Sequence, residues 1–179
     1  MAERRFEGLV EVYTGNGKGK TTAAMGLALR ALGHGMKVYI IQFMKGKTVY
    51  GEIKSLERFK PNVVVEQFGR KEFVSKEHPT EADFRFAREA LERAREVVMS
   101  GEWDVVILDE VNVALGFNLI SCEGVLDLIK NKPRHVELVL TGRYAPQEII
   151  EVADLVSEVK EVKHPYRTSH KPPRMGIEY

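Results

Sequence analysis

Eight consecutive residues near the start of the chain have the types and spacing that suit binding of a polyphosphate. They are Gly15-Asn16-Gly17-Lys18-Gly19-Lys20-Thr21-Thr22. The glycines let backbone N–H groups approach phosphate oxygens closely. Lys20 would reach the terminal phosphates, and the Thr21 hydroxyl would hold Mg2+. The stretch therefore predicts binding of a nucleoside triphosphate, and it does not by itself indicate which bond of the triphosphate breaks.

The first glycine of this loop is displaced from the common phosphate-loop pattern. In G-x-x-x-x-G-K-[ST] the first position is glycine, whereas Thr14 stands there in this chain and Gly15 follows one place later. Gly19, Lys20 and Thr21 remain in register with the pattern. The loop is also flanked correctly, with an apolar run before it and an alanine-rich helical pattern after it.

Two further polar segments follow apolar runs and could act on a bound triphosphate. The run 105–108 ends in Asp109-Glu110. Either carboxylate could hold Mg2+, directly or through water, and Glu110 could alternatively orient an attacking water as in an ATPase. Arg143 follows another run, and a planar guanidinium suits a phosphate. Lys18 either adds a second positive charge near the phosphates or points to solvent.

The elements that must position these residues alternate between short apolar runs and amphipathic stretches. The apolar runs predict strands at residues 8–14, 37–43, 63–68, 103–109, 136–141 and 155–162. The amphipathic stretches predict helices at residues 20–32, 49–59, 122–130 and 146–153, and a long helix that begins at Thr80. Such alternation favours an α/β fold with a mostly parallel sheet of about six strands and helices on both faces.

This architecture predicts where a ligand binds. In open parallel sheets ligands gather at the carboxyl ends of the strands. We therefore expect the phosphate loop to meet residues 43–47, 68–73, 109–112 and 141–143, each of which directly follows a predicted strand.

The composition limits the classes of protein to be considered. The 179 residues are most simply one domain, 1–179, with residues 163–179 as an extended C-terminal segment. Lys and Arg total 27 and Asp and Glu total 26, and this balance argues against a nucleic-acid partner. No apolar run reaches membrane-spanning length and no signal peptide is evident, so we expect a soluble, cytoplasmic protein.

Two further segments stand outside this scheme. Gly46-Lys47-Thr48 repeats the end of the phosphate-loop pattern, but no glycine-rich turn precedes it, so we interpret it as a chance match. The polar, proline-rich residues 163–179 form either an extended flap over a site or a disordered end.

Taken in order along the chain, these segments resemble the ATP:cob(I)alamin (corrinoid) adenosyltransferases of the phosphate-loop type. The resemblance includes the displaced glycine of the loop. It continues through the segments Ile41-Gln42-Phe43-Met44-Lys45-Gly46, Val106-Ile107-Leu108-Asp109-Glu110, Leu140-Thr141-Gly142-Arg143, Val162-Lys163-His164-Pro165 and Met175-Gly176-Ile177-Glu178-Tyr179.

The resemblance implies a RecA-like, P-loop NTPase-type sheet, a homodimer, and transfer of the 5′-deoxyadenosyl group of ATP to the Co(I) of a reduced corrinoid with release of triphosphate. ATP, the corrinoid and an electron-donating reductase would be its partners, and Mg2+ its cofactor. Lys20, Glu110 and Arg143 would then stabilise the leaving triphosphate, with Mg2+ held by Thr21, Glu110 and Asp109.

One segment departs from the pattern of the family. Where the family carries a Gly-Phe-Thr-Trp-Glu-Thr-like stretch, this chain has Phe68-Gly69-Arg70-Lys71-Glu72-Phe73-Val74. Phe68 and Phe73 are therefore the candidates for the corrinoid side. A RecA-like ATPase or nucleotide-gated regulator, a small-molecule kinase and a non-enzymatic nucleotide-binding module remain as alternatives.

Overall fold

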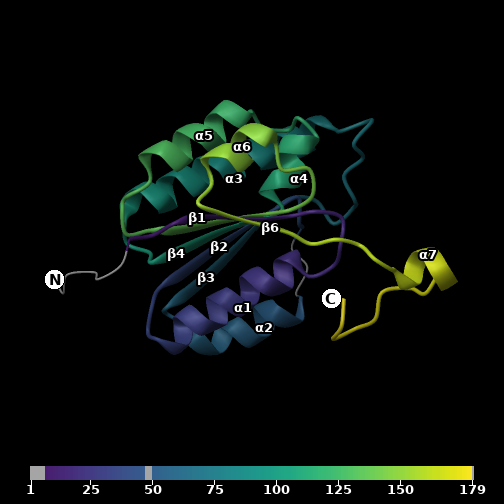
Figure 1. Ribbon diagram of the computed structural model, residues 1–179, viewed down its shortest axis with the longest axis horizontal. Coiled ribbons are helices and arrows are strands. Elements are labelled where there is room, and N and C mark those ends of the chain that lie inside the picture. Colours follow the sequence, from purple (N-terminus) through teal and green to yellow (C-terminus); the bar gives the residue numbers. More distant parts are fainter. Residues whose placement is uncertain (1–6, 47–49, 179) are drawn as a thin grey trace.

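One parallel sheet forms the centre of the computed structural model, which describes residues 7–46 and 50–178 (Figure 1). Its strands are β1 (Val10–Thr14), β2 (Val38–Phe43), β3 (Val63–Phe68), β4 (Val105–Asp109), β5 (Glu137–Thr141) and β6 (Leu155–Glu158). Their order is β3-β2-β4-β5-β1-β6, and each neighbouring pair is parallel. The predicted α/β fold with a parallel sheet of six strands is confirmed.

Helices cover both faces of this sheet (Figure 1). On one face lie α3 (Glu81–Ser100), α4 (Val111–Gly116), α5 (Cys122–Asn131) and α6 (Gln147–Val152). On the other lie α1 (Lys20–Gly33) and α2 (Gly51–Leu56), the latter followed by a 3-10 turn at Glu57–Phe59. Every residue of β2 and β4 is buried, as expected for near-continuous apolar runs in the middle of a doubly covered sheet.

The longest helix begins where the sequence predicts it. The Thr80 side chain accepts a hydrogen bond from the Asp83 N–H, and the Asp83 carboxylate accepts one from the Thr80 N–H at 2.8 Å, so a capping box closes the start of α3. Asp83 also accepts from Arg70 Nε at 2.9 Å. The start of α3 is therefore tied to the loop that follows β3.

The predicted strand at residues 155–162 is wrong in its second half, because β6 ends at Glu158. The Val159 N–H donates to the Thr14 carbonyl at 2.8 Å, and the Val159 carbonyl accepts from the Gly17 N–H at 2.7 Å. Val159 therefore connects the end of β1 to the phosphate loop, and the chain no longer pairs as a strand beyond Glu158.

Two short helices were not predicted. The first is α4, which follows Glu110 directly and contains two β-branched residues in six, a composition that weakens a helical signal. The second is α7 (Pro165–Ser169), which lies in the C-terminal segment that was expected to be extended or disordered. Pro165 occupies the first turn of α7, where a missing N–H costs nothing.

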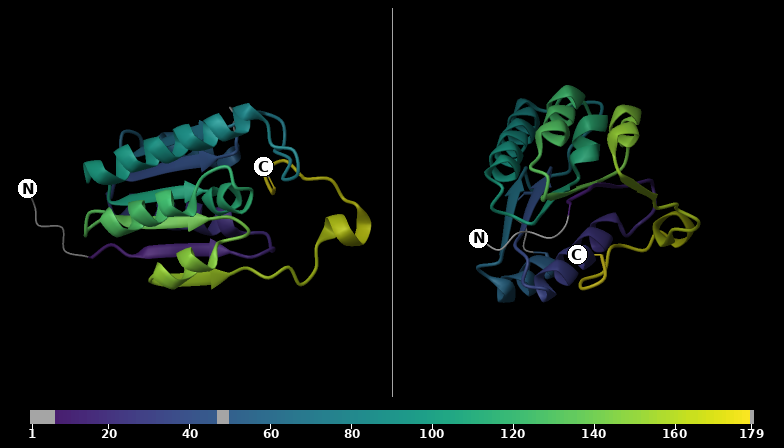
Figure 2. Two further views of the ribbon diagram at one scale, coloured as in Figure 1. Left: turned by 90° about the horizontal axis from the view of Figure 1, so that it is seen from above. Right: turned by 60° about the vertical axis from the view of Figure 1, so that its left-hand side comes forward.

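The C-terminal segment leaves the sheet and then returns. After β6 it passes beyond the carboxyl ends of the strands, forms α7 and turns back, so that the C-terminal end lies near the loops at this edge (Figure 2). Within the described ranges, no helix is long and apolar enough to cross a membrane. Of the Gly46-Lys47-Thr48 motif, Lys47 and Thr48 lie outside the described residues.

Candidate nucleotide and acceptor site

The phosphate loop connects β1 to α1 and depends on glycine at specific positions. Gly15 and Gly19 have φ angles of 97° and 121°, which L side chains rarely adopt. A Cβ on Gly15 would lie 2.5 Å from the Val159 carbonyl oxygen, and one on Gly17 would lie 2.8 Å from the Lys160 carbonyl. Gly15, the displaced first glycine, is thus required by the close approach of Val159.

The Lys20 side chain folds back onto the phosphate loop that precedes it. Its Nζ donates to the Gly17 carbonyl at 2.6 Å, and the residue is 8% exposed. Burial lowers the pKa of Lys20, although the nearby Glu110 carboxylate opposes this shift. An ammonium that has lost much of its hydration interacts strongly with a phosphate group that reaches it.

Asp109, at the end of β4, is fully buried and accepts four side-chain hydrogen bonds. Thr21 Oγ1 and Thr141 Oγ1 donate to Oδ1 at 2.9 and 2.7 Å. Gln42 Nε2 and Lys45 Nζ donate to Oδ2 at 3.0 and 2.7 Å. Burial alone would raise the pKa of Asp109, but the charge and hydrogen bonds of these partners outweigh it and lower the pKa. Asp109 is therefore ionised and joins α1, β2 and β5 at the carboxyl edge of the sheet.

Glu110 is held in the left-handed region, with φ of 64°, at the point where β4 turns into α4. Its backbone N–H donates to Thr141 Oγ1 at 3.1 Å. Burial and the neighbouring Asp109 charge raise the pKa of Glu110, and Lys45 and Lys20 oppose that shift. A strained, partly buried carboxylate beside a phosphate loop is the kind of group that functional sites retain.

Two cavities meet at Glu110. The first, of about 440 Å3, is lined by the phosphate loop from Gly17 to Thr22 together with Arg143 and Tyr144. The second, of about 270 Å3, lies between the segments that follow β2 and β3. Both cavities are also lined by Val113 and Phe117 of α4 and its end. Glu110 and this apolar surface therefore separate a basic cavity from a neighbouring one.

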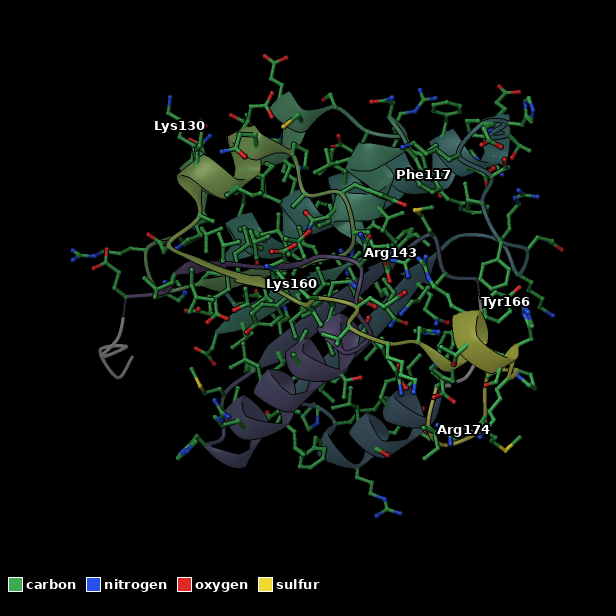
Figure 3. All side chains as sticks on the ribbon, turned by 45° about the vertical axis from the view of Figure 1, so that its right-hand side comes forward. Phe117, Lys130, Arg143, Lys160, Tyr166 and Arg174 are labelled. Carbon is green, nitrogen blue, oxygen red and sulfur yellow. The ribbon has the colours of Figure 1, made fainter. Side chains whose placement is uncertain are left out.

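Arg143 and Lys18 lie at the outer side of the first cavity. The Arg143 guanidinium donates to the Asn16 carbonyl at 3.4 Å, and Figure 3 places Arg143 beside the loop, with Phe117 above it. Lys18, for which the sequence left two orientations open, donates to the Ile177 carbonyl at 3.1 Å and the Glu178 carboxylate at 3.2 Å. Its partners thus come from the C-terminal segment.

The two phenylalanines predicted for the corrinoid side do not lie together. Phe73 is fully exposed and lines the second cavity. Phe68 is partly buried against the core and lines a different groove, between β3 and α3. Of these two, Phe73 is the one that lines the cavity next to the nucleotide loop.

Sequence reasoning included Lys45 only within the range 43–47 that was expected to meet the phosphate loop, and it did not name Gln42 or Phe117 as site residues. Gln42 and Lys45 had a usable signal, because a polar residue within a buried strand and a lysine just after it both lie at the carboxyl edge. Phe117 had none, since it depends on the unpredicted α4.

The donor atoms at the loop suit Mg2+. Thr21 contributes a hydroxyl oxygen, and Asp109 and Glu110 contribute carboxylate oxygens, which are hard ligands of the kind Mg2+ prefers alongside water and phosphate oxygens. Both oxygens of Asp109 are already engaged, so Thr21 and Glu110 are the more accessible donors. In the described part of the chain, no three His, Cys, Asp or Glu side chains gather as a metal site of their own.

The fold and the site together have the arrangement of a P-loop NTPase-like α/β protein, with its phosphate loop at the carboxyl edge of a parallel sheet. Comparison with known proteins then defines the family. Residues 6–179 match the family described as ATP:corrinoid adenosyltransferase BtuR/CobO/CobP, and the chain belongs to that family.

Individual relatives agree with this assignment. The chain is 37% identical to a corrinoid adenosyltransferase of Escherichia coli over 172 residues, which cover 96% of this chain and 86% of that protein. It is 37% identical to a corrinoid adenosyltransferase of a Sinorhizobium species over 181 residues, covering 100% of this chain and 84% of that one. It is 36% identical to the corresponding protein of Salmonella typhimurium over 172 residues.

Proposed function

We propose that this chain transfers the 5′-deoxyadenosyl group of ATP to the reduced cobalt of a corrinoid and releases inorganic triphosphate. The electron pair of Co(I) forms the new bond to the C5′ carbon. The C5′–O5′ bond breaks, and its electrons remain on the α-phosphate oxygen of the departing triphosphate. The nucleophile belongs to the second substrate, so the protein must align the two substrates and stabilise the leaving group.

The observation that carries this proposal is the pair of cavities that meet at Glu110. One contains the phosphate loop, and the other opens between the loops after β2 and β3. A transfer between two substrates needs two such compartments with a shared boundary. Hydrolysis of ATP would need only the first compartment.

The residues of the first cavity fit the stabilisation of a leaving triphosphate. The backbone N–H groups from Gly15 to Thr22 and the Lys20 ammonium would bind the phosphates. Arg143, which lines the same cavity and donates to the Asn16 carbonyl of the loop, would add a guanidinium that pairs with phosphate oxygens. Preorganised charges of this kind lower the barrier because they need no rearrangement as charge develops.

Mg2+ completes this arrangement in the proposal. Thr21 and Glu110 would hold it, and Asp109 would orient the Thr21 hydroxyl through the hydrogen bond at 2.9 Å. When bound, the ion neutralises charge on the triphosphate. Asp109 would therefore act on the ion indirectly, because it holds the Thr21 hydroxyl in place.

The second cavity is proposed as the acceptor side. Phe73 and Phe117 offer apolar surface there, and Lys45 and Arg70 offer hydrogen-bond donors. A cob(I)yrinic acid a,c-diamide or a complete cob(I)alamin are the two acceptors that we propose. Since the reaction consumes Co(I), an electron-donating reductase must supply it. A homodimer completes the proposal and rests on the resemblance to the family. A single domain, 1–179, rests on the length of the chain, and a cytoplasmic location rests on its apolar runs, which are too short to span a membrane.

A product assay tests the proposed function. The chain is incubated with Mg2+, ATP and a chemically reduced corrinoid, and triphosphate and adenosylcorrinoid are quantified together. We expect the two products to appear in equal amounts. Formation of ADP and phosphate without adenosylcorrinoid would contradict the proposal and favour an ATPase in which Glu110 orients water.

A further inference from the structure

The carboxylate of Glu178 is held by two cations from different parts of the chain. Lys18 Nζ, within the phosphate loop, lies 3.2 Å from Glu178 Oε1. Arg174 Nη2 donates to Oε1 at 3.1 Å, and Arg174 Nε donates to Oε2 at 3.2 Å. The Arg174 backbone N–H adds a bond to Oε2 at 2.8 Å. One carboxylate thus receives four donors around its two oxygens.

This arrangement has the chemistry of a small anion site. A guanidinium that donates through two nitrogens binds carboxylate and phosphate groups in the same geometry. The hydrogen bonds from Arg174 are the main cause that lowers the pKa of Glu178 to about 2, with Lys18 contributing, so the group is an anion at neutral pH. The Glu178 carboxylate therefore marks a position where Lys18 and Arg174 can jointly hold a negative charge.

The position of this carboxylate connects it to the triphosphate. Glu178 and Ile177 line the cavity of about 440 Å3 that contains the phosphate loop. Glu178 and Arg174 also line a neighbouring cavity of about 610 Å3, between the loop and the C-terminal segment. Four lysines line this cavity of about 610 Å3, namely Lys18, Lys160, Lys163 and Lys171. Figure 3 shows Arg174 in the C-terminal segment below α7, and Arg174 and the α7 residue Tyr166 both line this cavity.

We propose that Lys18 and Arg174 form a second phosphate subsite, which binds the terminal phosphate of a triphosphate chain, and that the Glu178 carboxylate fills this subsite when no phosphate does. The inference rests on the proposed function, since it names where the distal end of the leaving group is held. Triphosphate carries more negative charge than one carboxylate, so it displaces Glu178 and gains both cations. Glu178 then acts as an internal competitor that weakens the binding of free triphosphate and favours its release.

The test measures binding of inorganic triphosphate to the full chain by titration calorimetry in the presence of Mg2+. Arg174→Gln removes one cation of the subsite, and we expect about tenfold weaker binding, the loss typical of one charge-assisted contact. Glu178→Gln removes the competitor without changing its shape, and we expect severalfold tighter binding. The two changes therefore act in opposite directions.

A matched control separates the subsite from general charge. Arg167, in α7, pairs with Glu161 at 2.6 Å. It lines neither the cavity of about 440 Å3 nor the cavity of about 610 Å3. Arg167→Gln removes the same charge from the same segment, and we expect triphosphate affinity to stay within about twofold of the unchanged chain. Residues 165–178 are exposed, so circular dichroism should show that all three variants retain the fold.

Two results would overturn the subsite. The first is an unchanged affinity for triphosphate in Arg174→Gln. The second is an equal loss in Arg167→Gln, which would indicate unspecific attraction. Failure of the proposed function is seen in a separate experiment: the unaltered chain would then form no adenosylcorrinoid from ATP and reduced corrinoid. That result does not depend on how tightly the variants bind triphosphate.

Discussion

Replacing Lys45 with methionine should leave a fully buried carboxylate without its counter-ion. The Lys45 side chain is 17% exposed, and its Nζ lies 2.7 Å from Asp109 Oδ2. Removing one partner of a buried ion pair typically costs about 3–5 kcal/mol. Asp109 keeps its hydrogen bonds from Thr21, Thr141 and Gln42, so the lower end of that range, about 3 kcal/mol, applies.

Thermal unfolding measures this loss. For a chain of this size, about 3 kcal/mol corresponds to a decrease in Tm of about 6–12 °C. The variant Lys60→Met provides the matched control, because Lys60 pairs with Glu57 at 3.4 Å on the surface, where both side chains are 63% exposed. An exposed pair contributes little, so its Tm should change by no more than about 2 °C.

The pH dependence gives a second readout. In the unaltered chain the pKa of Asp109 is lowered, so its stabilisation is present at neutral pH and is lost only as the pH falls through the folded-state pKa. Without Lys45, burial raises that pKa, and the deficit should grow as the pH rises from acid to neutral. The double variant Lys45→Met/Asp109→Asn removes both charges and should recover most of the loss. Equal Tm values for Lys45→Met and the unaltered chain at pH 7 would refute this reasoning.

Three further outcomes follow from the site and the core. Lys20→Ala should lower the rate of adenosyl transfer at least about a hundredfold, as for loss of one preorganised charge or donor, and near-normal turnover would remove Lys20 from its role. Phe73→Ala should raise the KM for the corrinoid more than the KM for ATP, and equal effects would place the acceptor elsewhere. Burial, with Glu11 beside it, raises the pKa of Glu137 to about 7, so its stabilisation is lost as the pH rises from about 4.5 to 7. Glu137→Gln should therefore gain Tm relative to the unaltered chain between pH 5 and pH 8, by about 2–4 °C after allowance for solvent screening, and a constant difference would contradict the assignment.

The central sheet and the phosphate loop were predictable because their signals are local. The strands β2 and β4 are near-continuous apolar runs, and the loop has glycines and a lysine at fixed spacing. The meeting of Thr21, Asp109 and Thr141 also followed, since parallel strands bring their carboxyl ends to one edge.

Features that depend on contacts between distant segments could not be predicted in this way. Residues 159–162 include two valines, which favour a strand, yet β6 ends at Glu158 because the Val159 carbonyl bonds to the Gly17 N–H of the phosphate loop. The α4 helix begins after the left-handed Glu110, a backbone state that the residue type does not indicate. The contact between Lys18 and Glu178 joins residues that are 160 positions apart. Each of these depends on packing rather than on local propensity.

The bond that breaks in ATP is the most direct test of the account. ATP is prepared with oxygen-18 in the bridge between C5′ and the α-phosphorus, and the reaction with reduced corrinoid is analysed by mass spectrometry. Attack of cobalt on C5′ predicts that the label leaves with inorganic triphosphate, while the adenosylcorrinoid carries none. Label retained on a nucleoside diphosphate, with unlabelled inorganic phosphate as the other product, would contradict adenosyl transfer by this chain.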